Sequence, residues 1–181
     1  MRLEGTRLKE QDFQELPGVI YYKPYTRYKF SAGYAVSVFL EGLRNGKIIG
    51  AVCRRCGRVF VPPRSYCEYC HRPTDEFVEL PDRGEISTAV ISYISAKRGR
   101  LEEPVIVGVV RLETPGYRQD SYEFAGLFHR LCGVTEEDVK TGRAIGMKVK
   151  ARWKPPEERR GSILDIECFE PITTGEGGEE Q

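Results

Sequence analysis

The sequence has few of the residue patterns that carry catalysis. Only two histidines occur among its 181 residues, and neither lies near a plausible nucleophile in the sequence. The chain also has no glycine-rich phosphate-binding loop and no HExxH or HxxE pattern, so it offers no recognisable phosphate or catalytic-zinc motif. These absences predict a chain that has no catalytic set of its own and is not an enzyme by itself.

The sequence has neither a large charge excess nor a long apolar run. Its formal net charge is +1, whereas domains that bind nucleic acid nonspecifically usually carry a strong basic excess. No apolar run approaches the about 20 residues that span a bilayer, and the charged amino terminus lacks the apolar core of a signal peptide. With 40% hydrophobic residues, the chain can form one ordinary core and a small satellite. We therefore expect a cytoplasmic protein that associates with no membrane.

Four of the six cysteines form two CxxC pairs, ten residues apart, in the stretch CRRCGRVFVPPRSYCEYC. Each CxxC turn directs two sulfurs to one point, and Gly57 can adopt the positive φ that closes such a turn. The spacing predicts a rubredoxin-like zinc ribbon over residues 49–77, with one structural Zn²⁺ bound by Cys53, Cys56, Cys67 and Cys70. Two disulfides or one redox-active CxxC pair are the alternatives, and His71 could replace one sulfur.

The predicted ribbon and the two remaining cysteines both argue against a catalytic role. An ion with four cysteine ligands has no open coordination position to activate water, and it stabilises a segment too small to have its own core. Cys132 and Cys168 are expected to be free thiols at core-facing positions, because a reducing compartment disfavours disulfides. A nucleophilic Cys132 would need a base, and His129, three residues away, would not face it on a strand.

A helix is predicted ahead of the ribbon. Residues 1–18 form a charged extension, either a short partner-dependent helix or disordered, and residues 19–48 form a helical segment. The helix itself is expected to run from a cap at Ser31 to a stop at Asn45 and Gly46.

An aromatic and basic segment precedes this helix and includes Tyr25, Arg27 and Tyr28. Such side chains could stack on and neutralise a nucleotide-like ligand. They are equally suited to wrapping a partner protein, since tyrosine and arginine are enriched in protein interfaces. We favour the second interpretation.

The pattern changes to β-strands after an exit linker over residues 71–80. Five strands are predicted, with a short helix between the third and fourth that begins at Thr135 and ends at Gly142. The apolar run 103–113 is typical of a strand covered on both faces. This layout predicts a C-terminal five-stranded OB-fold barrel over residues 78–172, in a protein that is mainly β with a small amount of α. The tail, residues 173–181, is expected to be disordered.

The last two strands carry a basic stripe and its expected counter-charges. Alternation places Lys148, Lys150, Arg152 and Lys154 on one face of the fourth strand. In the closing stretch, Leu164, Ile166 and Cys168 are expected to point inward and Asp165 and Glu167 outward. The stripe could contact single-stranded nucleic acid, but we favour cross-strand ion pairs with these two acids.

A second basic group, Lys97, Arg98 and Arg100, is expected in the loop between the first two barrel strands. Loops at this edge bind ligands in many OB-folds. The group is therefore a candidate for contacting an anion, and a solvated turn is the alternative.

Taken together, these features resemble the zinc-ribbon and OB-fold family known as domain of unknown function 35. The resemblance covers about residues 21–172 and includes the helix-to-ribbon junction LEGLRNGKIIG. Its other elements are the four ribbon cysteines with Gly57, Pro62-Pro63-Arg64, Gly84 at the start of the barrel and FEPI at its end. The charged extension before Val19 departs from the family pattern.

The resemblance implies a non-catalytic scaffold subunit that binds a thiolase-superfamily enzyme and helps hold or channel acyl-CoA. In that family the partners are acetyl-CoA acetyltransferase, hydroxymethylglutaryl-CoA synthase-like enzymes, or sterol-carrier-type thiolases and aldolases. The candidate contacts to CoA or the partner are Tyr25, Arg27, Tyr28, Arg64, Lys97, Arg98 and Arg100, because CoA phosphates need cations and its adenine an aromatic wall. The alternatives are a single-stranded nucleic-acid-binding OB-fold module and a free-standing acyl-CoA enzyme.

Overall fold

The computed structural model describes residues 9–15, 26–74, 76–95, 99–118 and 125–172. The chain divides into two compact units, Met1–Ser31 and Ala32–Gln181. In the first unit, helix α1 covers Glu10–Glu15, and the rings of Tyr28 and Phe30 lie 6.0 Å apart. The tail expected to be disordered and most of the charged extension lie outside the described residues.

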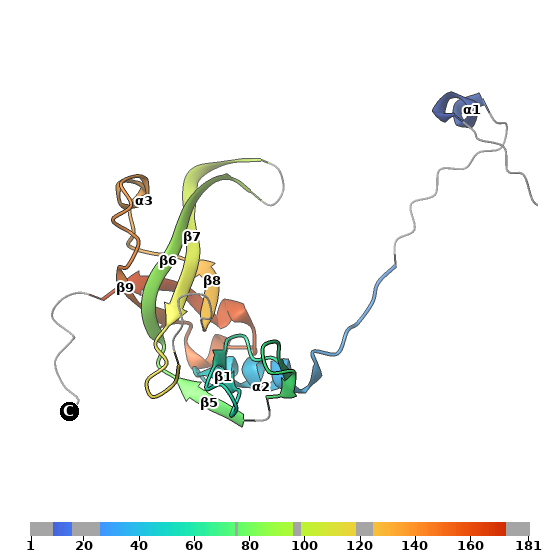
Figure 1. Ribbon diagram of the computed structural model, residues 1–181. Helices are drawn as coiled ribbons and strands as arrows, with labels where there is room; N and C mark the ends of the chain where they lie inside the picture. The colour runs from blue at the N-terminus through green and yellow to red at the C-terminus, as the bar shows by residue number, and fades with distance from the viewer. Residues whose placement is uncertain (1–8, 16–25, 75, 96–98, 119–124, 173–181) are drawn as a thin grey trace, which may run out of the picture. The chain divides into compact units, whose positions relative to one another are not determined.

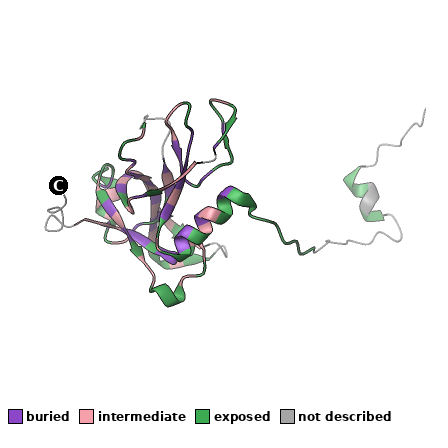
Figure 2. Cartoon of the chain, turned by 90° about the horizontal axis from the view of Figure 1, so that it is seen from below, coloured by how far each residue is buried: buried purple, intermediate pink, exposed green. Residues whose placement is uncertain are grey.

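Helix α2, Gly33–Arg44, begins the second unit and packs its later turns against the ribbon. Figure 2 shows the exposed start of α2 in green and buried positions towards its other end. The predicted stop is confirmed, since Asn45 is the C-cap and Gly46 adopts φ 72°. The predicted Ser31 cap is wrong: the N-cap is Ala32, without a side-chain hydrogen bond. The backbone turns at Gly33, which adopts φ 72°. The Ser31 side chain, two residues earlier, is therefore not at the N-cap position from which it could accept from the first N–H groups of the helix.

A three-stranded antiparallel sheet in the order β2-β1-β5 follows the helix. Its strands are β1 (Ile48–Val52), β2 (Val59–Phe60) and β5 (Glu76–Leu80). The exit linker expected over 71–80 is therefore wrong for its second half. There, β5 pairs with every residue of β1, and exposed ion pairs at 2.7 Å join Lys47 to Glu79 and Arg54 to Glu76.

The barrel is a five-stranded antiparallel sheet in the order β10-β9-β6-β7-β8. The strands are β6 (Arg83–Ile94), β7 (Arg100–Leu112), β8 (Gly126–Arg130), β9 (Lys148–Trp153) and β10 (Ile166–Pro171). A parallel bridge between Leu131 and Phe169 closes it, together with a 2.8 Å hydrogen bond from the Cys132 N–H to the Phe169 carbonyl. Helix α3 (Glu136–Lys140) lies between β8 and β9, as the OB-fold layout predicts (Figure 1).

Close backbone contact explains two glycines of the barrel. A Cβ added at Gly84 would collide with the Arg111 carbonyl oxygen, and one at Gly108 with the Thr88 carbonyl oxygen. Side chains are therefore excluded at these positions, where β6 and β7 curve to close a small barrel.

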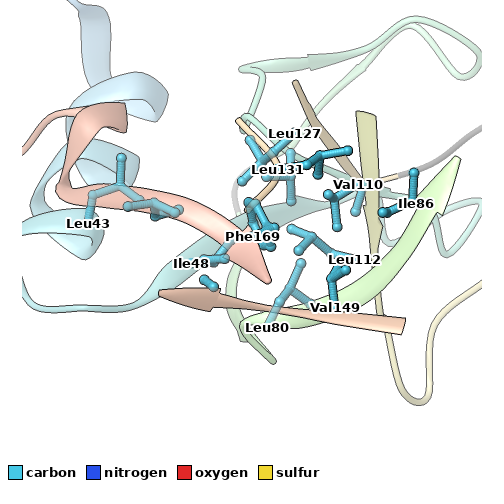
Figure 3. Packing of buried hydrophobic residues seen from close by; sticks show 14 of the residues in the cluster. Leu43, Ile48, Leu80, Ile86, Val110, Leu112, Leu127, Leu131, Val149 and Phe169 are labelled. Atoms are coloured by element: carbon cyan, nitrogen blue, oxygen red, sulfur yellow. The ribbon is translucent and has the colours of Figure 1, made fainter. Parts of the chain in front are cut away.

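One hydrophobic core joins the helix, the ribbon sheet and the barrel. Figure 3 shows Leu43 from α2 and Ile48 from β1 on one side of Phe169, with barrel side chains on the other. Phe169 is fully buried, as are Leu43 and Ile48. Because these side chains belong to one continuous cluster, the ribbon sheet and the barrel are packed as a single body.

Two positions in the closing stretch lie opposite to expectation. Leu164 is 64% exposed, whereas Asp165 is only 2% exposed. Both belong to a 3-10 turn, Ile163–Asp165, that precedes β10 and breaks the strand alternation. The Asp165 carboxylate accepts hydrogen bonds from the backbone N–H groups of residues 160, 161 and 162, at 2.7–3.1 Å, so it is buried as the acceptor that organises this turn.

The prediction of free thiols at Cys132 and Cys168 is wrong, because the two form a disulfide with Cα atoms 5.8 Å apart. Cys132 follows the end of β8, and Cys168 lies in β10, where the barrel closes. The core-facing position of Cys168 is confirmed, since it is fully buried. The two residues are 36 positions apart, so only the closed sheet brings them together.

Replacing Asp165 with asparagine is expected to destabilise the fold by about 1–3 kcal/mol, because buried N–H groups lose a charged acceptor. Burial tends to raise the pKa of Asp165, but the N–H donors of Ser162, Arg160 and Gly161 outweigh it and lower that pKa. The contribution is therefore complete above the unfolded-state pKa of about 4 and is lost as pH falls through the lower folded-state pKa. Urea unfolding at pH 7 and at pH 3 measures both effects.

The control is Glu167→Gln, whose carboxylate is partly exposed and pairs with Arg152; it is expected to cost less than about 1 kcal/mol. Equal unfolding midpoints for Asp165→Asn and the parent at pH 7 would contradict the role given to this carboxylate.

Candidate metal centre and ligand-contact residues

Two similar turns hold the four ribbon cysteines. In the first, the Gly57 N–H donates to the Cys53 carbonyl at 2.8 Å, and Gly57 adopts φ 70°. In the second, the His71 N–H donates to the Cys67 carbonyl at 2.8 Å, and His71 adopts φ 51°. Each turn therefore ends in a left-handed residue that folds the backbone back around a sulfur pair. The predicted role of Gly57 is confirmed.

The structure brings the four sulfurs together. The Sγ atoms of Cys53, Cys56, Cys67 and Cys70 all lie within 4.8 Å of one another, and those of Cys56 and Cys67 are 3.8 Å apart. Zinc–sulfur bonds of about 2.3 Å in a tetrahedron place the sulfurs about 3.8 Å apart. The cluster therefore fits one tetrahedral ion, and its four thiols are free rather than paired in disulfides. His71 is exposed and is not part of this cluster.

The cluster has its own environment, separate from the main core. Its small apolar group consists of Cys53, Phe60 and Cys67, with Cys56 and Cys70 packed against it. Such a group buries too little apolar surface to fix two turns and the short ribbon β3 (Tyr66–Cys67) and β4 (Arg72–Pro73). A metal ion would supply the missing constraint.

Three of the four thiols have a shifted pKa, and the shifts differ in direction. For Cys56, the hydrogen bonds from the Arg58 backbone and side chain outweigh burial and lower the pKa to about 6. Burial and hydrogen bonding to neighbouring sulfurs raise the pKa of Cys67 and bring that of Cys70 to about 12. Only some of the sulfurs are therefore thiolates at neutral pH before a cation binds, so metal binding must release protons and weaken as pH falls.

Arginine side chains surround the cluster. Arg54, Arg55 and Arg72 line an open cavity of about 400 Å³ together with Cys53 and Pro73. Nearby, the Arg58 guanidinium lies 4.1 Å from the centroid of the Tyr69 ring. Four thiolates around one Zn²⁺ would carry a formal charge of about −2, which the Arg58 guanidinium, a hydrogen-bond partner of Cys56, would partly offset.

The metal-binding turns are tied to the barrel. The Arg118 N–H, in the connection that follows β7, donates to the Gly57 carbonyl at 3.1 Å. Arg58 and Arg118 also form a parallel bridge. The position of the first CxxC turn is thus fixed from the sheet on one side and from the barrel on the other.

The predicted contact residues that the structure describes lie in separate stretches of the chain. Arg27 and Tyr28 are exposed in the first unit. Arg64 lies in the ribbon, where it pairs with Glu68 at 2.9 Å. Arg100 is the first residue of β7 rather than a loop residue, and it pairs with Ile94 at the end of a hairpin that projects from the barrel (Figure 1). Tyr25, Lys97 and Arg98 lie outside the described residues.

Ion pairing accounts for part of the basic stripe on β9. Arg152 contacts Glu167 at 3.0 Å and Glu170 at 3.3 Å, which confirms the expected cross-strand pairing for this arginine. Asp165 does not take part as expected, because its carboxylate caps the turn before β10.

The structure adds a cavity that the sequence did not indicate. It has a volume of about 420 Å³ and is lined by Arg130, Cys132, Arg152, Lys154, Leu164, Ile166 and Glu167. These residues come from β8, β9, β10 and the turn before β10, so no local pattern could have joined them.

No helix in the described residues is long and apolar enough to span a bilayer.

Both parts of the second unit, the ribbon and the barrel, match domains of a known protein family. Residues 40–76 match the rubredoxin-like zinc ribbon domain of ChsH2, and residues 77–154 match the C-terminal OB-fold domain of ChsH2. A DUF35 domain-containing scaffold protein of Methanocaldococcus jannaschii is 28% identical over 112 residues, which are 61% of this chain and 70% of that protein.

Two solved structures are similar to this chain. A protein of unknown function from the DUF35 family of Sulfolobus solfataricus has a TM-score of 0.53 and 25% identity, over 77% of this chain and 87% of that one. The Ltp2–ChsH2(DUF35) aldolase has a TM-score of 0.51 and 18% identity, over 75% of this chain and 92% of the matched one. The second likeness shows a shared fold.

The Cys67→Ser variant is expected to lose most of its zinc when challenged with a chelator that leaves the parent protein loaded. The reason is that the variant keeps only three thiolate ligands, and a serine hydroxyl binds zinc too weakly to complete the tetrahedron. Metal analysis of the purified proteins, with about one zinc per chain in the parent, measures this. The control is Cys168→Ser, which should keep its metal; an equal zinc content in Cys67→Ser and the parent would contradict the assignment.

Proposed function

Because the chain belongs to the DUF35 family, with its ChsH2-type zinc ribbon and OB-fold, we propose that it is a non-catalytic scaffold subunit of a thiolase-superfamily complex. In this role it binds a thiolase-type enzyme and helps hold or channel acyl-CoA between active sites. Cys53, Cys56, Cys67 and Cys70 bind one Zn²⁺, which stabilises the ribbon and takes no part in the chemistry. The observation that carries the proposal is a closed four-sulfur cluster on a body shared with an OB-fold barrel.

The chemistry of the cluster supports a structural role. Four sulfur donors fill a tetrahedron and leave no position for substrate or water. His129, three residues before Cys132, is buried, with Nε2 3.1 Å from the Ile163 carbonyl oxygen. Cys132 is bonded to Cys168, so it is not a thiolate nucleophile.

The relatives support the scaffold role and the class of partner. The Methanocaldococcus protein is itself described as a scaffold protein, and one solved neighbour is the Ltp2–ChsH2(DUF35) aldolase. A thiolase-superfamily partner is the choice that agrees with the family resemblance and with a chain whose described residues contain no catalytic set.

The charge distribution supports a protein partner over nucleic acid. The net charge is +1, and Arg152, at the centre of the basic stripe, is already paired with two glutamates. A stripe that binds single strands would present free cations beside stacked aromatic rings, and the central arginine of this stripe is not free.

The full-length zinc-loaded chain, mixed with a purified thiolase-superfamily enzyme of the same organism, is expected to elute with it as one complex. Size-exclusion chromatography with light scattering measures the mass and composition of that complex. An oligonucleotide of mixed sequence serves as the competing ligand. Binding to the oligonucleotide with a steep salt dependence, and none to the enzyme, would contradict the proposal.

Arg64 provides a test of direct CoA contact. In the assembled complex, Arg64→Ala is expected to weaken CoA binding roughly 10-fold or more, the loss of one charge-assisted hydrogen bond to a phosphate. The matched control is Arg83→Ala, which removes another exposed arginine paired with a glutamate, Glu113, at 3.0 Å. Isothermal titration should show unchanged affinity for the control; equal affinities for all three proteins would show that Arg64 does not contact CoA.

A further inference from the structure

The outer surface of three neighbouring barrel strands is unexpectedly apolar. The register of these strands places Val90, Val107 and Arg130 in one cross-strand row, and Thr88, Val109 and Phe128 in the next. Directly paired residues project from the same face of a sheet. We refer to these six residues as the outer face of β6, β7 and β8, strands that lie side by side in Figure 1.

Exposure shows that this face is not part of the core. Phe128 is 64% exposed and Val90 is 54% exposed, while Leu127, next to Phe128 on β8, is 3% exposed and faces inward. Val107 and Val109 are half-buried. The sequence of β7 is typical of a strand covered on both faces, yet the described residues cover only its inner side. Exposed apolar patches of this kind commonly mark interaction sites.

Charged residues bound the outer face at both ends, in different ways. Beyond Thr88 and Val109, Glu85 pairs with Arg111 and also with Lys148, at 3.5 Å for the lysine. At the opposite end, Arg130 makes no ion pair within the described residues. One end is therefore neutralised internally, and the other presents an uncompensated cation.

Arg130 also connects the outer face to the cavity between β8, β9 and β10. That cavity has a volume of about 420 Å³ and is lined by Lys154, Arg152 and the exposed side chain of Leu164. Glu167 and Glu170 both contact Arg152, whereas Arg130 pairs with neither of them nor with another acid of the described residues. The apolar rows thus continue into a small basic cavity with an apolar rim.

We propose that the outer face of β6, β7 and β8, together with this cavity, is the docking surface for the thiolase-type enzyme. The enzyme presents apolar side chains to Val90 and Phe128 and a carboxylate to Arg130. This assignment rests on the proposed function, since it names the surface through which that partner is bound.

Charge complementarity favours a different protein over a second copy of this chain. A two-fold interface would place the outer face against itself, so Arg130 would need an acid from the same surface. The neighbouring acids are already paired: Glu85 contacts Arg111, and Glu167 contacts Arg152. Burying Arg130 without a counter-charge is costly, and a partner that supplies a carboxylate removes this cost.

The decisive experiment measures the affinity of the zinc-loaded full chain for the thiolase-superfamily enzyme by isothermal titration. Phe128→Asp and Val90→Asp, on different strands, are each expected to weaken binding roughly 30-fold or more, because they place a charge within a desolvated apolar contact. Arg130→Glu is expected to weaken it roughly 10-fold or more by reversing the end charge. The matched control, Ile145→Asp, alters another apolar residue, 52% exposed, that lies outside the two rows and should leave the affinity unchanged.

Each outcome has a separate meaning, provided that zinc content and thermal unfolding match those of the parent. If the parent binds and Phe128→Asp and Val90→Asp bind equally well, the surface is wrong while the scaffold function stands. If the parent itself does not bind the enzyme, the proposed function fails and the partner assigned here fails with it. If the parent is a dimer that Phe128→Asp converts to a monomer, a second copy occupies the face and the assignment is overturned.

Discussion

The ribbon depends on four sulfur atoms that two short turns hold within 4.8 Å of one another. These turns have almost no apolar support, because their own cluster is limited to Phe60 and the cysteines. Both turns have the same backbone conformation, since the residue after the second cysteine of each pair is left-handed. This residue is Gly57 in the first turn and His71 in the second. A bound ion would convert this arrangement into a rigid element, since its coordination energy replaces the burial that so short a segment cannot provide.

The second structural constraint is the single core beneath the ribbon. Strand β1 carries Ile48 into the same cluster that holds Phe169 of the barrel, while its end leads directly into Cys53. The Arg118 N–H reaches the first turn from the barrel side. Ribbon and barrel therefore present their outer surfaces in a fixed relation, which is the property that a scaffold requires. Reactive groups are not needed for this role, and the cysteine pair nearest the barrel cavity is closed as a disulfide.

The sequence predicted what local spacing determines. Two CxxC pairs identify the metal cluster, and Thr135, the predicted start of the short helix, is the N-cap of α3 and forms a capping box with Asp138. Strand alternation found the five barrel strands and their order of appearance. The failures are non-local, fall where a turn shifts the pattern or, at Ser31, follow from the positive φ of Gly33. Cys132 meets Cys168 only after the barrel closes, and Asp165 is buried because a 3-10 turn interrupts the alternation. The apolar run in β7 was expected to be covered on both faces, and the half-exposed outer side became visible only in the folded sheet.

The central claim is that this chain organises acyl-CoA chemistry and does not perform it. Its most direct test is thioester turnover measured for the zinc-loaded chain alone, for the thiolase-superfamily enzyme alone and for the two combined, with acetoacetyl-CoA as the probe. We expect no turnover by the chain alone, and activity only where the enzyme is present. Conversion of the thioester by the purified chain without the enzyme would contradict the account.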